Sequence, residues 1–246
     1  MTDAAELLAR ITATVDYLRV SVGPHDHGWI GCETLLAEPD RLGELVQSTK
    51  AGRGTDRDDV AMSLFVQGYS FRIASLAIGG WVLGDAVIDL APTRTSIALG
   101  RDRPNAVAVD DARVLTVGEP LTALHEALIE SHLARLVRAA HAACLVGEPL
   151  LWGNVAASCA SSFGAFAGEL SDRRVEIRDR AEAFFASAPP PLTEAGCLVR
   201  LGERWAWERK SCCLWHLTDA GFRCEDCSLW TDEERRRRYA ANEAGR

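Results

Sequence analysis

The chain has 246 residues, of which 48% are hydrophobic and 25% are charged. This balance is typical of a globular protein and excludes wholesale disorder or a fibrous repeat. The formal net charge of −8 argues against a nucleic-acid-binding protein, because contacts to phosphates require a basic surface. The first residues are acidic and lack the apolar core of a secretory signal, so we expect the protein to stay in the cytoplasm.

One apolar segment, residues 60–83, is long enough to cross a bilayer. Its one charged residue is Arg72, near the middle, and polar residues and three glycines dilute it further. An arginine at that depth costs roughly 2.5 kcal/mol or more to insert into a membrane. We therefore expect a long buried core helix over residues 58–78 and no transmembrane segment.

Around this segment, the hydrophobic pattern predicts helices first and then a small sheet. An amphipathic helix is expected over residues 4–20 and a shorter helix over residues 39–48. Four short runs of β-type residues follow the long apolar helix, with turn-rich segments between them: residues 87–90, 95–99, 106–109 and 114–117. Because this spacing leaves no room for crossover helices, we expect the sheet to be antiparallel and small.

Three further helices are predicted in the second half of the chain. The first two, over residues 118–144 and 147–170, each place a proline in the first turn, where its missing N–H is tolerated. The second of them is rich in alanine, serine and glycine, which allows close helix packing. The third, over residues 172–187, is charged and ends at a run of prolines.

The proline run, at residues 189–191, is the clearest boundary in the chain. Beyond it, residues 197–201 and 204–208 have the pattern of two strands of a hairpin. The sequence therefore predicts an α+β fold, with a mainly helical body and a small antiparallel sheet over residues 1–188. A compact C-terminal metal module is expected over residues 189–246.

Eight cysteines are an unusual number for a cytoplasmic chain, where thiols stay reduced and more often bind metals or act as catalysts. Four are scattered, and the other four lie within sixteen residues: Cys212, Cys213, Cys224 and Cys227. Two intervening residues make the second pair a usual local chelate. The adjacent first pair would point to opposite sides of an extended backbone, so joint ligation needs a bend or a centre with separate ligand positions. On spacing alone, zinc, an iron–sulfur cluster and reduced structural thiols all remain open.

The same C-C-x10-C-x2-C pattern, on a chain of this length, resembles the family of FhuF-type ferric-siderophore reductases. The resemblance implies that Cys212, Cys213, Cys224 and Cys227 bind the two irons of a [2Fe-2S] cluster, so that residues 189–246 are an iron–sulfur module. It also implies a siderophore-binding region within residues 1–188. The implied activity is the one-electron reduction of chelated Fe(III) to Fe(II), which releases iron because siderophores bind Fe(III) far better. The alternatives are a non-enzymatic iron–sulfur sensor or siderophore-binding protein, and a zinc-stabilised interaction module.

The partners follow from the implied activity and from motifs that the sequence lacks. It contains no dinucleotide-binding fingerprint, P-loop or nucleophile elbow. We therefore expect a ferric siderophore as substrate, an external electron donor such as a ferredoxin or a flavin reductase, and no catalytic residue beyond the cluster ligands. Arg72 and Arg94 are candidates to face an anionic chelate, and each is also a candidate for an ordinary salt bridge.

The residues that surround the cysteines suit either an electron-transfer centre or a small core. Four of the seven tryptophans lie between residues 205 and 230, where they would shield a cluster or simply pack the module. His216 lies between the two cysteine pairs. Because four thiols are already available, we expect this histidine near the ligands rather than among them.

Overall fold

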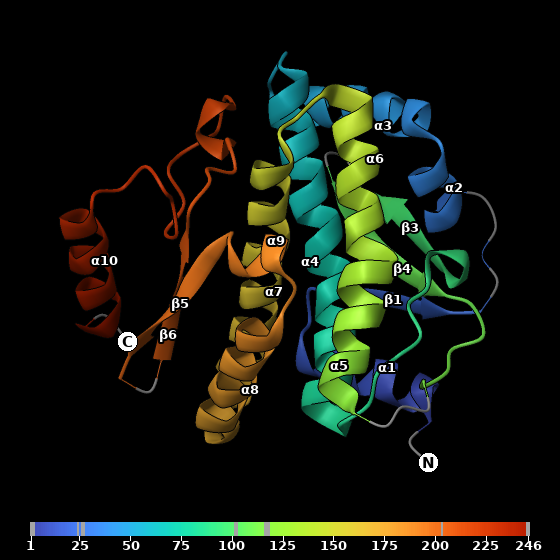
Figure 1. Ribbon diagram of the computed structural model, residues 1–246. Helices are drawn as coiled ribbons and strands as arrows, with labels where there is room; N and C mark the ends of the chain where they lie inside the picture. The colour runs from blue at the N-terminus through green and yellow to red at the C-terminus, as the bar shows by residue number, and fades with distance from the viewer. Residues whose placement is uncertain are drawn as a thin grey trace.

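The computed structural model describes residues 3–23, 25, 28–100, 103–115, 119–202 and 204–244. Two long helices, α4 and α7, pack along one another at its centre, and the remaining elements surround them (Figure 1). The helices are α1 (Ala4–Thr14), α2 (Cys32–Ala37), α3 (Pro39–Arg53), α4 (Asp58–Gly84), α5 (Pro120–Leu124), α6 (Ala134–Cys144), α7 (Glu148–Glu169), α8 (Arg174–Ser187), α9 (Pro190–Thr193) and α10 (Asp232–Ala244). Short 3₁₀ turns are η1 (Pro92–Arg94), η3 (Ser171–Arg173) and η4 (Trp215–Leu217).

Helix α4 is buried on nearly all sides, as its uniform apolar composition predicts. Within the described ranges it alone is long and apolar enough to cross a membrane, but 83% of its most apolar window is buried inside the protein. Arg72 is 9% exposed, and its Nε donates a hydrogen bond to the carbonyl of Asn105 over 3.2 Å. The prediction of a core helix is therefore confirmed, and the helix continues to Gly84.

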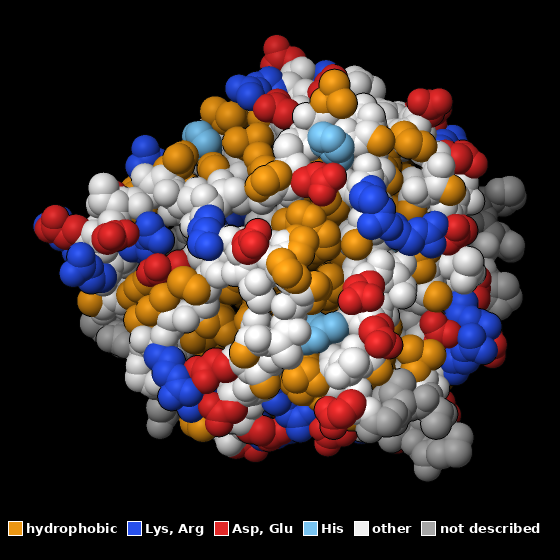
Figure 2. All heavy atoms as spheres, viewed as in Figure 1, with side chains coloured by type: hydrophobic (Ala, Val, Ile, Leu, Met, Phe, Trp, Pro, Cys, Tyr) orange, Lys and Arg blue, Asp and Glu red, His pale blue; other side chains and the backbone are white. Residues whose placement is uncertain are grey.

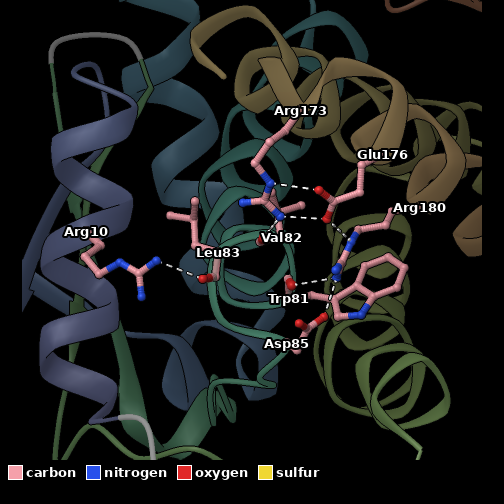
Figure 3. A network of polar contacts seen from close by, with 8 residues as sticks. All are labelled: Arg10, Trp81, Val82, Leu83, Asp85, Arg173, Glu176 and Arg180. Atoms are coloured by element: carbon pink, nitrogen blue, oxygen red, sulfur yellow. Dashed lines mark hydrogen bonds and ion pairs between the residues drawn. The ribbon is translucent and has the colours of Figure 1, made fainter. Parts of the chain in front are cut away.

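Three arginines from neighbouring elements cap the C-terminal end of α4 (Figure 3). Their guanidinium groups donate to carbonyls of its last turns, each over 2.9 Å: Arg10 to Leu83, Arg173 to Val82, and Arg180 to Trp81. The last carbonyls of a helix lack the partners of its interior, and positive charge is favourable at this end of its dipole. The Trp81 carbonyl also accepts from the N–H of the C-cap residue Asp85 over 3.1 Å. These hydrogen bonds connect α1 and α8 to the central helix.

Close packing around α4 depends on Gly79. A Cβ atom there would lie 2.6 Å from Cζ of Phe166 and 2.9 Å from Cγ1 of Ile11. We expect Gly79→Ala to lower the free energy of unfolding by about 1–3 kcal/mol, because the core would be overpacked. Gly164→Ala on α7 is the matched control: its Cβ meets nothing within 4 Å, and alanine favours the helix by up to about 1 kcal/mol.

Urea denaturation followed by circular dichroism measures both changes. A Gly79→Ala protein as stable as wild type would contradict the tight contact between α4, α7 and α1.

The sheet has four strands in the order β1-β4-β3-β2. Its strands are β1 (Arg19–Val22), β2 (Trp29–Gly31), β3 (Thr95–Leu99) and β4 (Pro104–Val109). Strands β2, β3 and β4 pair antiparallel as predicted, with Ile97 opposite both Ile30 and Val107. The predicted helix over residues 4–20 is wrong beyond Thr14: the chain turns there, and β1 pairs parallel with β4. The α+β class is confirmed.

The other two predicted strands do not form ladders. Within the described part of residues 87–90 and 114–117, the one pairing is a single antiparallel bridge between Ile88 and Val114. Residues 116 and 117 lie outside the described ranges.

The predicted helix over residues 118–144 contains an unexpected feature. Between α5 and α6 it continues as a π-helical segment, η2 (His125–Leu133). His132 in this segment is fully buried, and burial lowers its pKa to about 4. Its Nδ1 contacts the carbonyl of Leu90 at 2.6 Å, and its Nε2 contacts the hydroxyl of Tyr69 at 2.7 Å. The π segment thereby joins the central helix to the chain that leads into the sheet.

The predicted hairpin is confirmed as β5 (Gly196–Leu201) and β6 (Arg204–Arg209). It packs against α7 and α8, and Trp207 stacks on Phe185 with ring centroids 4.5 Å apart. The chain then forms an irregular loop and ends with α10, which lies on the far side of the hairpin from α8 in Figure 1. On the face shown in Figure 2, acidic and basic side chains are interspersed with hydrophobic ones rather than gathered by sign.

Candidate metal centre

The four clustered cysteines lie in the loop between β6 and α10. Cys213 and Cys227 are 3% and 1% exposed, and Cys212 and Cys224 are half-buried. Leu214 adopts a left-handed conformation with φ 65°, and its N–H donates to Sγ of Cys212 over 3.4 Å. This bend directly follows the adjacent cysteines. Such a bend is needed if both are to bind the same centre.

The loop brings the two cysteine pairs together. Sγ of Cys213 lies 3.6 Å from Sγ of Cys224, and Sγ of Cys212 lies 3.5 Å from Nδ1 of His216. Cys227 is close enough for its charge to act on Cys212. Among the described residues no three thiol, imidazole or carboxylate groups meet the geometry of a single metal ion. The thiols are thus neighbours that do not form a closed mononuclear site.

Neighbouring thiols in the loop shift one another's pKa. Hydrogen bonds from Cys212 and Cys224 lower the pKa of Cys213, and the buried cation of Arg209 acts in the same direction. The same coupling, with burial, raises the pKa of both partners. Negative charge is therefore favoured at Cys213, which lies near the buried Arg209.

A buried polar network holds the cysteine loop against the central helices. The Arg209 side chain is 0% exposed; its Nη2 donates to Oδ1 of Asn154, and its Nε lies 3.7 Å from the carboxylate of Asp226. Asn154 on α7 donates to the hydroxyl of Ser63 on α4 over 2.8 Å. That hydroxyl in turn donates to the carbonyl of Cys213, also over 2.8 Å. The network therefore contacts both cysteine pairs, since Asp226 lies within the second.

Glycine 153 allows this close approach. A Cβ atom at Gly153 would overlap the hydroxyl of Ser211, so the chain just before the cysteines can contact α7 only where that helix has no side chain. Gly153 and Asn154 are adjacent on one helix. Together they provide the space and the polar anchor for the loop.

Hydrogen-bond donors without acceptors around the cysteine loop indicate what kind of bound group the loop would suit. Nε and Nη1 of Arg209, the hydroxyl of Ser211 and the indole N–H of Trp215 are buried and have no hydrogen-bond partner among the described residues. A buried cation with unused N–H groups is costly unless an anion or acceptor accompanies it. A centre bound by four thiolates is anionic and offers sulfur acceptors, so the residues present fit a four-thiolate metal centre, the class to which an iron–sulfur cluster belongs.

The match to a protein family agrees with the resemblance in the sequence. Residues 63–205 match the family described as ferric iron reductase FhuF-like transporter, and because this segment is more than half of the chain, the protein belongs to that family. A search of curated proteins finds no match. The matched segment includes Ser63 and Asn154 but ends before Cys212, so the cysteine motif rests on the sequence pattern and the geometry.

Sequence reasoning missed Ser63, Asn154 and Arg209. The available signal was weak: Ser63 and Asn154 are single polar residues within apolar segments, and Arg209 lies in a run of charged and polar residues, 208–211. Of the two arginines considered as chelate contacts, Arg72 is bonded to a backbone carbonyl. Arg94 pairs with Asp89 at 3.3 Å and with Asp111 at 3.0 Å. Both side chains have structural partners.

Proposed function

We propose that the protein is a ferric-siderophore reductase in which Cys212, Cys213, Cys224 and Cys227 bind a [2Fe-2S] cluster. Residues 189–246 would form the iron–sulfur module on a body formed by residues 1–188. The observation that carries the proposal is the contact between the two cysteine pairs, Cys213 with Cys224, beside the buried Arg209. Nε and Nη1 of that arginine have no hydrogen-bond acceptor among the described residues. Membership of a ferric iron reductase family supports the same activity.

When bound, a [2Fe-2S] cluster supplies one-electron transfer. The four cysteines would hold it, and Arg209 would offset its negative charge. N–H groups that point at ligand sulfurs raise the potential of such a centre, and Leu214 already donates to Cys212. One electron converts chelated Fe(III) to Fe(II), which the oxygen ligands of a siderophore hold weakly, and iron would be released in the cytoplasm.

The electron must come from another protein under this proposal. A nicotinamide gives a hydride, a flavin normally converts it to single electrons, and the sequence has no dinucleotide-binding fingerprint. We expect the purified protein to produce no Fe(II) from a ferric siderophore with NADPH alone. Addition of a ferredoxin and its reductase should start the reaction, followed with a chelator specific for Fe(II).

Turnover by flavin-free protein with NADPH alone would contradict the external donor. A protein that contains the cluster but reduces no ferric chelate with any donor would contradict the reductase and favour an iron–sulfur sensor.

A further inference from the structure

A cavity of about 580 Å³ lies beside the cysteine loop. It is open to solvent on one side and is lined mainly by residues of α7, the strand β6, helix α10 and the turn between the second pair of cysteines, elements that can be followed in Figure 1. Its volume is within the range of small-molecule sites. Asp226, which lies between Cys224 and Cys227 in the chain, is part of its lining. The cavity therefore reaches the backbone that carries two of the cluster ligands.

The side of the cavity formed by α7 consists of small residues. Gly164 and Gly168 both line it, and a Cβ atom added at either would meet nothing within 4 Å. Both glycines are exposed, so the described residues leave the space beside them unfilled. The space along α7 is therefore open to a ligand.

Two side chains in the lining, those of Tyr239 and Trp207, have hydrogen-bond donors without an acceptor among the described residues. Tyr239 and Trp207 are 9% and 7% exposed, and neither the Tyr239 hydroxyl nor the Trp207 indole N–H has a hydrogen-bond partner among the described residues. Arg174 and Arg204 also line the cavity. Buried donors of this kind are costly unless they are satisfied, so the lining suits a ligand whose surface presents oxygen acceptors.

We infer that this cavity binds the ferric chelate, an inference that rests on the proposed function. The ligand class is an Fe(III) complex that is neutral or anionic and has hydroxamate or catecholate oxygens at its surface. Donors from Tyr239, Trp207 and the two arginines would contact these oxygens. Asp226, paired with Arg209, marks the end of the cavity nearest the thiols.

The electron balance of the inferred step is simple. The four cysteines would hold the one-electron centre. The bound chelate would gain one electron, which the external donor supplies, and its Fe(III) would become Fe(II). No covalent bond of the chelator forms or breaks, and the chelator leaves unchanged.

Binding can be tested separately from electron transfer with gallium(III) complexes of a trihydroxamate and of a tricatecholate siderophore, which are not reduced. Calorimetry should show that wild-type protein binds at least one of them. Gly164→Trp, which fills the cavity, should weaken binding tenfold or more. Gly43→Trp on α3 is the matched control, because its Cβ also meets nothing within 4 Å and it does not line the cavity; it should bind like wild type.

All three proteins should have the same visible spectrum. If Gly164→Trp fails to fold, Ser161→Trp fills the same cavity from an exposed position.

The inference is overturned if the cavity-filling variant binds gallium complexes like wild type, or if wild type binds neither complex. The purified protein could also lack a cluster but still bind a gallium complex, with Gly164→Trp weakening that binding. This result would support the binding cavity and contradict only the proposed reductase function. Preference for one gallium complex identifies the class of chelator.

Discussion

Replacing Cys213 with serine is expected to abolish, or to shift strongly, the visible absorption of the anaerobically purified protein. Cys213 is 3% exposed, and its Sγ lies 3.6 Å from Sγ of Cys224 in the second pair. A serine alkoxide is a hard ligand that replaces a thiolate poorly at iron. Iron and acid-labile sulfide, measured per mole of protein, should fall with the absorption.

The matched control is Cys197→Ser. This cysteine lies on β5 in the same C-terminal part of the chain, but its side chain is exposed and it lies outside the four-cysteine loop. Iron, sulfide and absorption should stay at wild-type values in the control. Full iron and sulfide content in Cys213→Ser would remove that residue from the ligand set, and loss of iron from Cys197→Ser with the fold intact would show that the assignment is wrong.

Replacing Arg209 with methionine is expected to lower the free energy of unfolding by about 1–3 kcal/mol, the usual cost of leaving a buried hydrogen-bonding group without its partner. The methionine would leave Asp226 without its cation and the amide oxygen of Asn154 without a donor. Urea denaturation of the apo protein measures this change. In folded protein that holds the cluster, the reduction potential should also become more negative, because a cation near the centre favours its more negative reduced state.

Arg209→Lys separates charge from geometry. Lysine keeps the positive charge but lacks the planar fork that reaches both Asn154 and Asp226. We therefore expect a potential near that of wild type together with a smaller loss of stability. A methionine variant with unchanged stability and potential would contradict the role given to the buried network.

Local patterns predicted most of the fold. The long buried helix, the helix that ends at the proline run and the C-terminal hairpin were all predictable, because hydrophobic period and turn residues report on neighbours in the chain. Strand β1 was not, since its first two residues fall within the predicted helix over residues 4–20. They become a strand only through parallel pairing with β4, more than eighty residues away. The π-helical segment likewise has no local signal.

The site divides in the same way. Ligand types and their spacing are properties of the sequence, so the four cysteines could be singled out from it. The anchors could not, because Ser63, Asn154 and Arg209 meet only after α4, α7 and β6 have packed. The small residues of α7 show most clearly what the sequence could not predict. Their composition predicted close helix packing. Gly153 allows such an approach for the cysteine loop, while Gly164 and Gly168 line a cavity.

The central claim is that this chain passes single electrons to chelated Fe(III), and one anaerobic experiment tests it most directly. The protein is reduced with dithionite, freed of excess reductant and mixed with a ferric siderophore, while its visible spectrum and the Fe(II) formed are recorded. We predict that the oxidised spectrum returns and that about one Fe(II) appears per cluster, as a one-electron centre requires. A reduced protein whose spectrum stays unchanged with ferric hydroxamate and catecholate complexes, and which yields no Fe(II), would contradict the claim.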